Sequence, residues 1–155
     1  MKVTRALGAA GSAMAIAMLA AGTAYATETN HWTMAYGNAT VVADNYWWAQ
    51  DVTITGQHYL PSGANKCRRL YATAFDAAGR VMRNADYSPI AASTSWQCSA
   101  GVRDVSLKID TSVAGGPYAV QIEWQEKDSA DTTYWTEIDA VRCMRDTYQC
   151  TRLTF

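Results

Sequence analysis

Residues 117–127 read PYAVQIEWQEK, and their alternation decides the fold class. Large apolar side chains at Tyr118, Val120, Ile122 and Trp124 alternate with small or polar ones. This period of two puts all four on one face of a strand, whereas a helix would scatter them around its axis. The stretch therefore predicts a β-strand with one apolar and one polar face.

Similar stretches recur along the chain. Residues 51–60 and 104–110 alternate, and residues 70–75 are mostly apolar or aromatic on both faces, as expected of a strand in the middle of a sheet. Further strands are predicted at 32–36, 39–43, 80–83, 134–144 and 153–155. The first two of these form either one strand with a bulge at Gly37 or two separate strands. A turn is predicted at Asp44–Asn45. Roughly seven or eight strands predict an all-β fold. We expect a two-sheet antiparallel β-sandwich, immunoglobulin-like or jelly-roll-like, with a small β-barrel as the alternative.

The first 26 residues have the pattern of a secretory signal peptide. Lys2 and Arg5 precede an apolar run, and Ala24-Tyr25-Ala26 is a small-x-small cleavage site. The apolar run is short and Ala-rich for a stable membrane span. The sequence therefore predicts a cleaved signal peptide at 1–26 and a single domain at 27–155. It also predicts a secreted product, extracellular or periplasmic, and a composition of this kind favours a bacterial origin.

The charge balance argues against two classes of partner. Cleavage would take Lys and Arg from 13 to 11 against 14 Asp and Glu, which leaves a net charge near −3. Such a surface has no general attraction for nucleic acid or anionic lipid. No later segment has the pattern of a membrane span. We therefore expect no nucleic-acid partner and no membrane attachment after cleavage.

Four cysteines follow the predicted signal: Cys67, Cys98, Cys143 and Cys150. An even count in an exported chain predicts two disulfides, whereas a zinc site would want close C-x-x-C pairs, which the sequence lacks. Four cysteines leave three pairings open. The favoured bonds are Cys143 to Cys150 across a turn and Cys67 to Cys98 across a longer excursion. In the chain-entropy model these closures contribute about 2.5 and 3.7 kcal/mol.

The sequence contains no catalytic motif that we recognise. His58 shares a predicted strand face with Val52 and Ile54, where a hydrogen-bonded core or rim histidine is commoner than a catalytic base. Neither a nucleophile elbow nor a zinc or calcium motif occurs. Six carboxylates on one predicted hairpin leave glycoside hydrolysis and a weak cation site at 128–131 as minor alternatives: Glu123, Glu126, Asp128, Asp131, Glu137 and Asp139. We therefore expect no enzymatic activity, no cofactor and no metal site.

The aromatic content is the more informative feature. The chain has six Trp and nine Tyr, and only Tyr25 falls in the predicted signal. Secreted sandwiches and protein interfaces both use exposed Trp and Tyr for binding. The run Tyr46-Trp47-Trp48 is the predicted binding patch, since neighbouring residues on a strand face opposite sides and at least one ring should be exposed. The alternative is that Trp47 or Trp48 fills the core while the other covers a loop.

Basic residues near the cysteines suggest a second binding patch. Arg68 and Arg69 follow Cys67 directly, and further basic residues flank this pair or the other cysteines: Lys66, Arg142, Arg145 and Arg152. If the disulfides bring these segments together, the protein would present a positive patch for an acidic partner or an anionic glycan. The alternative is a solvated face balanced by nearby acids.

Three functional hypotheses follow from these features. The first is a non-catalytic binding or adaptor protein that acts through protein–protein contacts in an extracellular assembly. The second is a glycan- or cell-wall-binding module. A third is a secreted inhibitor of a hydrolase, with residues 84–99 as the candidate inhibitory loop.

Overall fold

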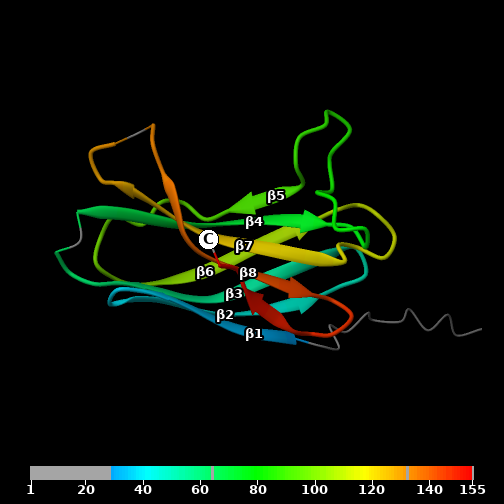
Figure 1. The fold of residues 1–155 in the computed structure, drawn as a ribbon, viewed down its shortest axis with the longest axis horizontal. Coiled ribbons are helices and arrows are strands. Elements are labelled where there is room, and N and C mark those ends of the chain that lie inside the picture. The colour runs from blue at the N-terminus through cyan, green and yellow to red at the C-terminus, as the bar shows by residue number, and fades with distance from the viewer. Residues whose placement is uncertain (1–28, 64, 132, 155) are drawn as a thin grey trace, which may run out of the picture.

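The computed structural model describes residues 29–63, 65–131 and 133–154. All regular structure in this part of the chain is β-strand, arranged as two antiparallel sheets packed against each other (Figure 1). The predicted signal peptide and its cleavage site lie outside the described residues. Within the described ranges the two sheets are not joined into a closed barrel, so the fold is the predicted sandwich.

The first sheet has the order β1-β2-β3-β6 and the second has the order β5-β4-β7-β8-β9. The first contains β1 (Thr29–Tyr36), β2 (Ala39–Trp47), β3 (Asp51–Leu60) and β6 (Gly101–Asp110). The second contains β4 (Lys66–Phe75), β5 (Ala91–Ser93), β7 (Ala119–Asp128), β8 (Thr136–Met144) and β9 (Cys150–Arg152).

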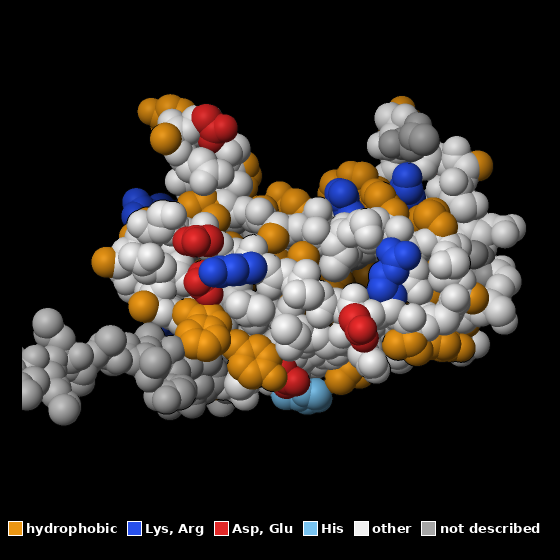
Figure 2. All heavy atoms as spheres, turned by 180° about the vertical axis from the view of Figure 1, so that it is seen from behind, with side chains coloured by type: hydrophobic (Ala, Val, Ile, Leu, Met, Phe, Trp, Pro, Cys, Tyr) orange, Lys and Arg blue, Asp and Glu red, His pale blue; other side chains and the backbone are white. Residues whose placement is uncertain are grey.

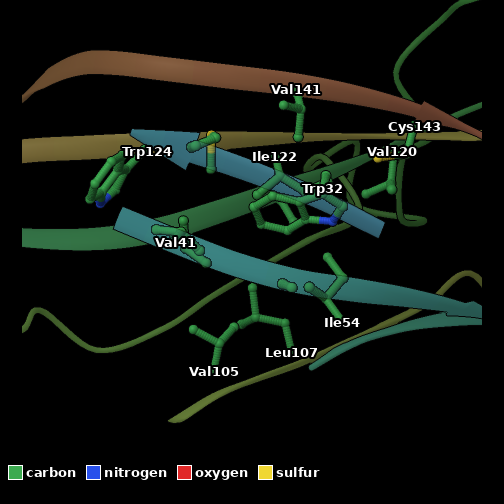
Figure 3. Close-up of a cluster of buried hydrophobic side chains, with 14 of the residues drawn as sticks. Trp32, Val41, Ile54, Val105, Leu107, Val120, Ile122, Trp124, Val141 and Cys143 are labelled. Carbon is green, nitrogen blue, oxygen red and sulfur yellow. The ribbon is translucent and has the colours of Figure 1, made fainter. Parts of the chain in front are cut away.

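The apolar faces of the two sheets form the core. Most of the alternating stretch 117–127 lies in β7, the middle strand of the second sheet, where Val120, Ile122 and Trp124 are fully buried; Tyr118 precedes the strand and is half-buried. Figure 3 shows the three buried side chains in one cluster with Val41 and Ile54 of the first sheet. Each buried aliphatic side chain contributes about 1.5–3 kcal/mol, so this interdigitation is what holds the sheets together.

The N-terminal hairpin differs in part from its prediction. Of the two interpretations offered for 32–43, two strands are correct, and they are joined at Gly37, whose φ of 60° allows the tight turn. The predicted turn at Asp44–Asn45 is wrong, because β2 continues through both residues. Asn45 is fully buried and accepts a hydrogen bond from the Trp32 indole at 2.9 Å. A buried cross-strand polar pair therefore outweighs the turn propensity of the sequence.

Both disulfides are those that the spacing favoured. Cys67 bonds to Cys98 and Cys143 bonds to Cys150. The second bond joins directly paired residues of β8 and β9, which places the final strand at 150–152 rather than at the predicted 153–155. Phe155 lies outside the described residues. No helix long and apolar enough to cross a membrane occurs in the described ranges.

Candidate functional site

Two loops project from the same side of the molecule, one near each end of β4 (Figure 1). Residues 76–90 join β4 to β5, and residues 129–135 join β7 to β8. Seen from behind, a saddle lies between the two projections, and hydrophobic and basic side chains are exposed there (Figure 2). We call this surface the saddle. Its floor carries Arg69, Tyr71, Trp96 and Lys127, and its rims carry Tyr87, Tyr134 and Trp135.

The first rim is a tight turn that holds Tyr87 outward. The backbone N–H of Asn84 donates to the carbonyl of Ser88 at 2.9 Å, and Arg83 donates to the carbonyl of Tyr87 at 2.7 Å. The Asp86 carboxylate accepts hydrogen bonds from the hydroxyl and the backbone N–H of Ser88, which lower the pKa of Asp86. Tyr87 itself has a φ of 65° and is 80% exposed. A tyrosine held in the left-handed region with its ring in water is a feature that often accompanies function.

The second rim is organised by Asp131. Its Oδ1 atom accepts hydrogen bonds from the backbone N–H groups of Thr133 at 2.7 Å and Tyr134 at 3.1 Å, and these bonds lower the pKa of Asp131. This Asx turn fixes the chain that leads into β8. Tyr134 is 78% exposed and Trp135 is 50% exposed. Beside them is an open hollow of about 220 Å³, also lined by Lys66 and Asp128.

The floor of the saddle is built around Trp96. The guanidinium carbon of Arg69 lies 4.6 Å from the centre of the Trp96 ring, and Nζ of Lys127 lies 5.0 Å from it. Arg69 and Lys127 come from the adjacent strands β4 and β7. Trp96 reaches them because the segment after β5 pairs with β4. The result is one indole ring in contact with two cations at the outer face of the second sheet.

A chain of hydrogen bonds continues from this floor along β7. Nε of Arg69 donates to Oε1 of Gln125 at 2.8 Å, and Gln125 donates to Glu123 at 3.0 Å. From the other direction, Arg142 donates to Gln121 at 2.9 Å, and Gln121 donates to the second oxygen of Glu123 at 3.2 Å. The carboxylate of Glu123 thus accepts from both amides, and each amide accepts from an arginine. This arrangement fixes the orientation of the Arg69 side chain.

Glu137 lies next to this chain, opposite Gln125 in the pairing of β7 with β8. Burial, together with the charges of Glu123 and Asp139, raises the pKa of Glu137 to about 7. One of its carboxyl oxygens is buried and has no hydrogen-bond partner among the described residues. Near neutral pH the Glu137 carboxyl would therefore hold or release a proton. The neighbouring Asp139 is in an ion pair, with its Oδ2 atom 2.6 Å from Nη2 of Arg152.

The predicted aromatic patch is not assembled as one exposed surface. Trp47 is 5% exposed and its indole N–H donates to the side chain of Asn30, so it is part of the core. Tyr46 and Trp48 are half-buried. This is the arrangement of the alternative interpretation, in which one Trp of the run fills the sandwich.

The predicted basic residues are spread over separate settings. Arg68 is 6% exposed and pairs with Glu126 at 2.7 Å inside the sandwich. Arg145 donates to the carbonyl of Trp48 at 2.6 Å, whereas Arg152 pairs with Asp139. Of the two arginines named as binding residues, Arg69 is the one that lies on the saddle.

His58 is buried, as the strand pattern predicts, but the predicted hydrogen bond is not found: its Nε2 has no partner among the described residues. It is 3% exposed and packs edge-on against Trp124, with ring centres 5.3 Å apart. Burial lowers the pKa of His58 to about 4, and the charges of Arg68 and Arg103 add to the effect. Among the described residues, no group of three His, Cys, Asp or Glu side chains is arranged to hold a metal ion, at 128–131 or elsewhere.

The sequence reasoning missed the aromatic residues that are most exposed. Tyr134 and Trp135 were assigned to the start of a strand, but β8 begins at Thr136 and both rings extend the loop. The available signal was an aromatic pair directly after the polar turn 128–133. Lys127 and Trp96 gave no local signal, because their contact joins segments that are distant in the sequence.

The described residues thus define a two-sheet antiparallel β-sandwich with two disulfides and an aromatic, basic saddle. No protein-family model matches the sequence, and no curated protein or solved structure gives a significant match.

Proposed function

We propose that this is a secreted binding or adaptor protein without catalytic activity, and that it docks a protein partner on the saddle in an extracellular assembly. The observation that carries the proposal is the exposure of Tyr87, Tyr134 and Trp135 on the two rims, at 80%, 78% and 50%. Tyr, Trp and Arg are the residue types that dominate the binding energy of protein interfaces.

The energetics of exposed rings support a partner. Burial of an aromatic side chain removes about 150–250 Å² from water. Burial of such a side chain is worth about 1.5–3 kcal/mol relative to leaving it exposed, and part of this offsets the cost of association. Three exposed rings beside a stacked Arg–Trp pair therefore offer a docking energy that the isolated fold does not use.

Secretion is part of the proposal and has two supports. One is the predicted signal peptide at 1–26. The other is the pair of disulfides, which persist in oxidising compartments and are compatible with an extracellular location.

A glycan-binding module is the second candidate. The hollow of about 220 Å³ beside Trp135 combines an aromatic ring with Asp128 and Lys66, and such groups hydrogen-bond to sugar hydroxyls. The charged groups of this hollow are partly paired with each other, since Nζ of Lys66 lies 2.7 Å from Oδ1 of Asp128.

The test is affinity capture from the culture supernatant of the source organism, with the exported protein on the matrix. Three proteins are compared: the wild type, the Tyr134→Ala/Trp135→Ala variant, and a Tyr59→Ala control on the outer face of the first sheet, where Tyr59 is 40% exposed.

We expect a discrete secreted protein to bind the wild type and the control and to be lost with the rim variant. Retention of the protein on an insoluble polysaccharide, with no protein captured, would favour the glycan module instead. A captured hydrolase that loses activity on binding would assign the inhibitor role.

A further inference from the structure

The floor of the saddle holds two cations in place without neutralising them. Arg69 and Lys127 lie 4.6 Å and 5.0 Å from the ring centre of Trp96. Among the described residues, neither has a carboxylate within ion-pair distance, although the charge of Lys127 contributes to the lowered pKa of Asp131, after the two backbone hydrogen bonds that this carboxylate accepts. A cation–π contact orients a cation but leaves its net charge, so both remain able to attract an anion.

The guanidinium of Arg69 is also pre-oriented. Its Nε donates to Gln125, which is 1% exposed and is itself fixed by its bond to Glu123. The guanidinium contacts the ring of Trp96, and the two terminal nitrogens make no hydrogen bond to a described residue. A planar fork of N–H donors with one edge unused matches the two oxygens of a carboxylate. Because its orientation is already fixed, binding there would lose little side-chain entropy.

A third cation adds to the local field. Arg103 donates from Nη1 to the carbonyl of Trp96 at 3.4 Å and to the hydroxyl of Ser95 at 3.3 Å. Two basic residues therefore lie on the indole of Trp96 and a third lies on its main chain, in a protein whose predicted net charge after cleavage is near −3. A positive site on a protein of this overall charge would attract an acidic segment and orient it as it approaches.

We propose that the partner places an acidic peptide segment on the saddle, and that a Glu or Asp carboxylate of this segment binds the terminal nitrogens of Arg69 and the ammonium of Lys127 beside Trp96. This inference rests on the proposed function and names the chemistry of its partner. The methylene groups of the acidic side chain would lie on the indole while the carboxylate meets both cations.

The experiment is an NMR titration of the ¹⁵N-labelled protein with an octaglutamate peptide, read at the indole N–H of Trp96 and the Nε–H of Arg69. Octaglutamine and polygalacturonate are titrated in parallel. The test variant is Arg69→Gln/Lys127→Gln. The matched control, Arg80→Gln/Lys108→Gln, removes the same charge from two ion pairs elsewhere on the surface, with Asp76 and Asp51. Arg69→Lys keeps the charge but loses the fork.

We expect octaglutamate to shift both signals, with an affinity that falls as salt rises. The affinity should drop at least tenfold in Arg69→Gln/Lys127→Gln, drop less in Arg69→Lys, and stay within twofold of wild type in the control. Absence of binding by the wild type, equal binding by the test variant, or binding of polygalacturonate in place of the peptide would each overturn the inference. The proposed function and this inference can be told apart. A captured partner whose binding needs Trp135 but is unaffected by Arg69→Gln/Lys127→Gln would support the proposed function and contradict this inference.

Discussion

Arg68 and Glu126 form an ion pair inside the sandwich, where Nε and Nη2 of Arg68 donate to Oε2 of Glu126 at 2.8 Å and 2.7 Å. Both residues are buried, at 6% and 9% exposed. The guanidinium also lies 5.0 Å from the ring centre of Trp124, so the pair sits against the core. Glu126 also lies 3.9 Å from Nζ of Lys66 through its other oxygen and lines the hollow beside Trp135.

This pair gives a stability prediction. Glu126→Leu leaves a buried arginine without its counter-ion, and we expect a loss of about 3–5 kcal/mol of unfolding free energy. The double variant Arg68→Met/Glu126→Leu removes both charges and should lie within about 2 kcal/mol of the wild type. Urea denaturation of the wild type, the two single variants and the double variant measures these changes in unfolding free energy. If the stability loss of the double variant equals the sum of the losses of the two single variants, the prediction is contradicted.

Gly56 marks a close approach between β2 and β3. A Cβ atom placed on Gly56 would overlap the carbonyl oxygen of Val42 and lie 2.5 Å from Cβ of Ala43. The contacting atoms belong to a strand and a buried alanine and have little room to move, so we expect Gly56→Ala to cost about 3 kcal/mol. Gly79→Ala is the control, since the turn there has open space and a φ of 76°. It should cost about 1 kcal/mol from backbone strain alone. Equal losses in the two variants would show that the strands can move apart.

His58 makes the fold sensitive to acid. Its pKa is lowered to about 4 in the folded protein, whereas the unfolded chain takes up the proton near pH 6.5. Stability should therefore fall as the pH drops from 6.5 toward 4, by up to about 1.4 kcal/mol per pH unit. We expect His58→Gln to flatten this dependence in urea denaturation at pH 7 and pH 4.5. His31→Gln, at an exposed residue, should keep the wild-type slope. An unchanged slope in His58→Gln would assign the acid sensitivity to other groups.

Glu137 has the opposite pH dependence. Burial raises its pKa to about 7, above the value of 4.5 for a free side chain. The folded protein therefore binds this proton more tightly than the unfolded chain does, and the carboxyl destabilises the fold as the pH rises through this range. Glu137→Gln should raise the melting temperature more at pH 8 than at pH 5. Asp104→Asn, at an exposed site, is the control. A shift of the same size at both pH values would contradict the prediction.

The sequence predicted the fold where local pattern and burial agree. The alternation of β3 and β7 and the spacing of the cysteines were sufficient, because one buried face per strand allows few arrangements. Prediction failed at Asp44–Asn45, where turn propensity was outweighed by a hydrogen bond from Trp32 on the neighbouring strand. The local signal was misleading because the deciding contact was not local.

The saddle was harder to predict than the fold. The run Tyr46-Trp47-Trp48 looked exposed from its composition, but strand parity directs Trp47 inward. Exposure of Trp135 depends on where β8 starts, which the sequence pattern did not resolve. The contacts of Arg69 with Trp96 and with Gln125 join β4 to two different segments, so only the folded chain brings them together.

The central claim is that the saddle is the docking surface, and its most direct test is the dissociation constant of the captured partner. We predict that Tyr134→Ala/Trp135→Ala raises this constant at least tenfold, about 1.4 kcal/mol of binding energy, while Tyr59→Ala leaves it within twofold. The same loss in both variants, or no loss in the rim variant, would contradict the account.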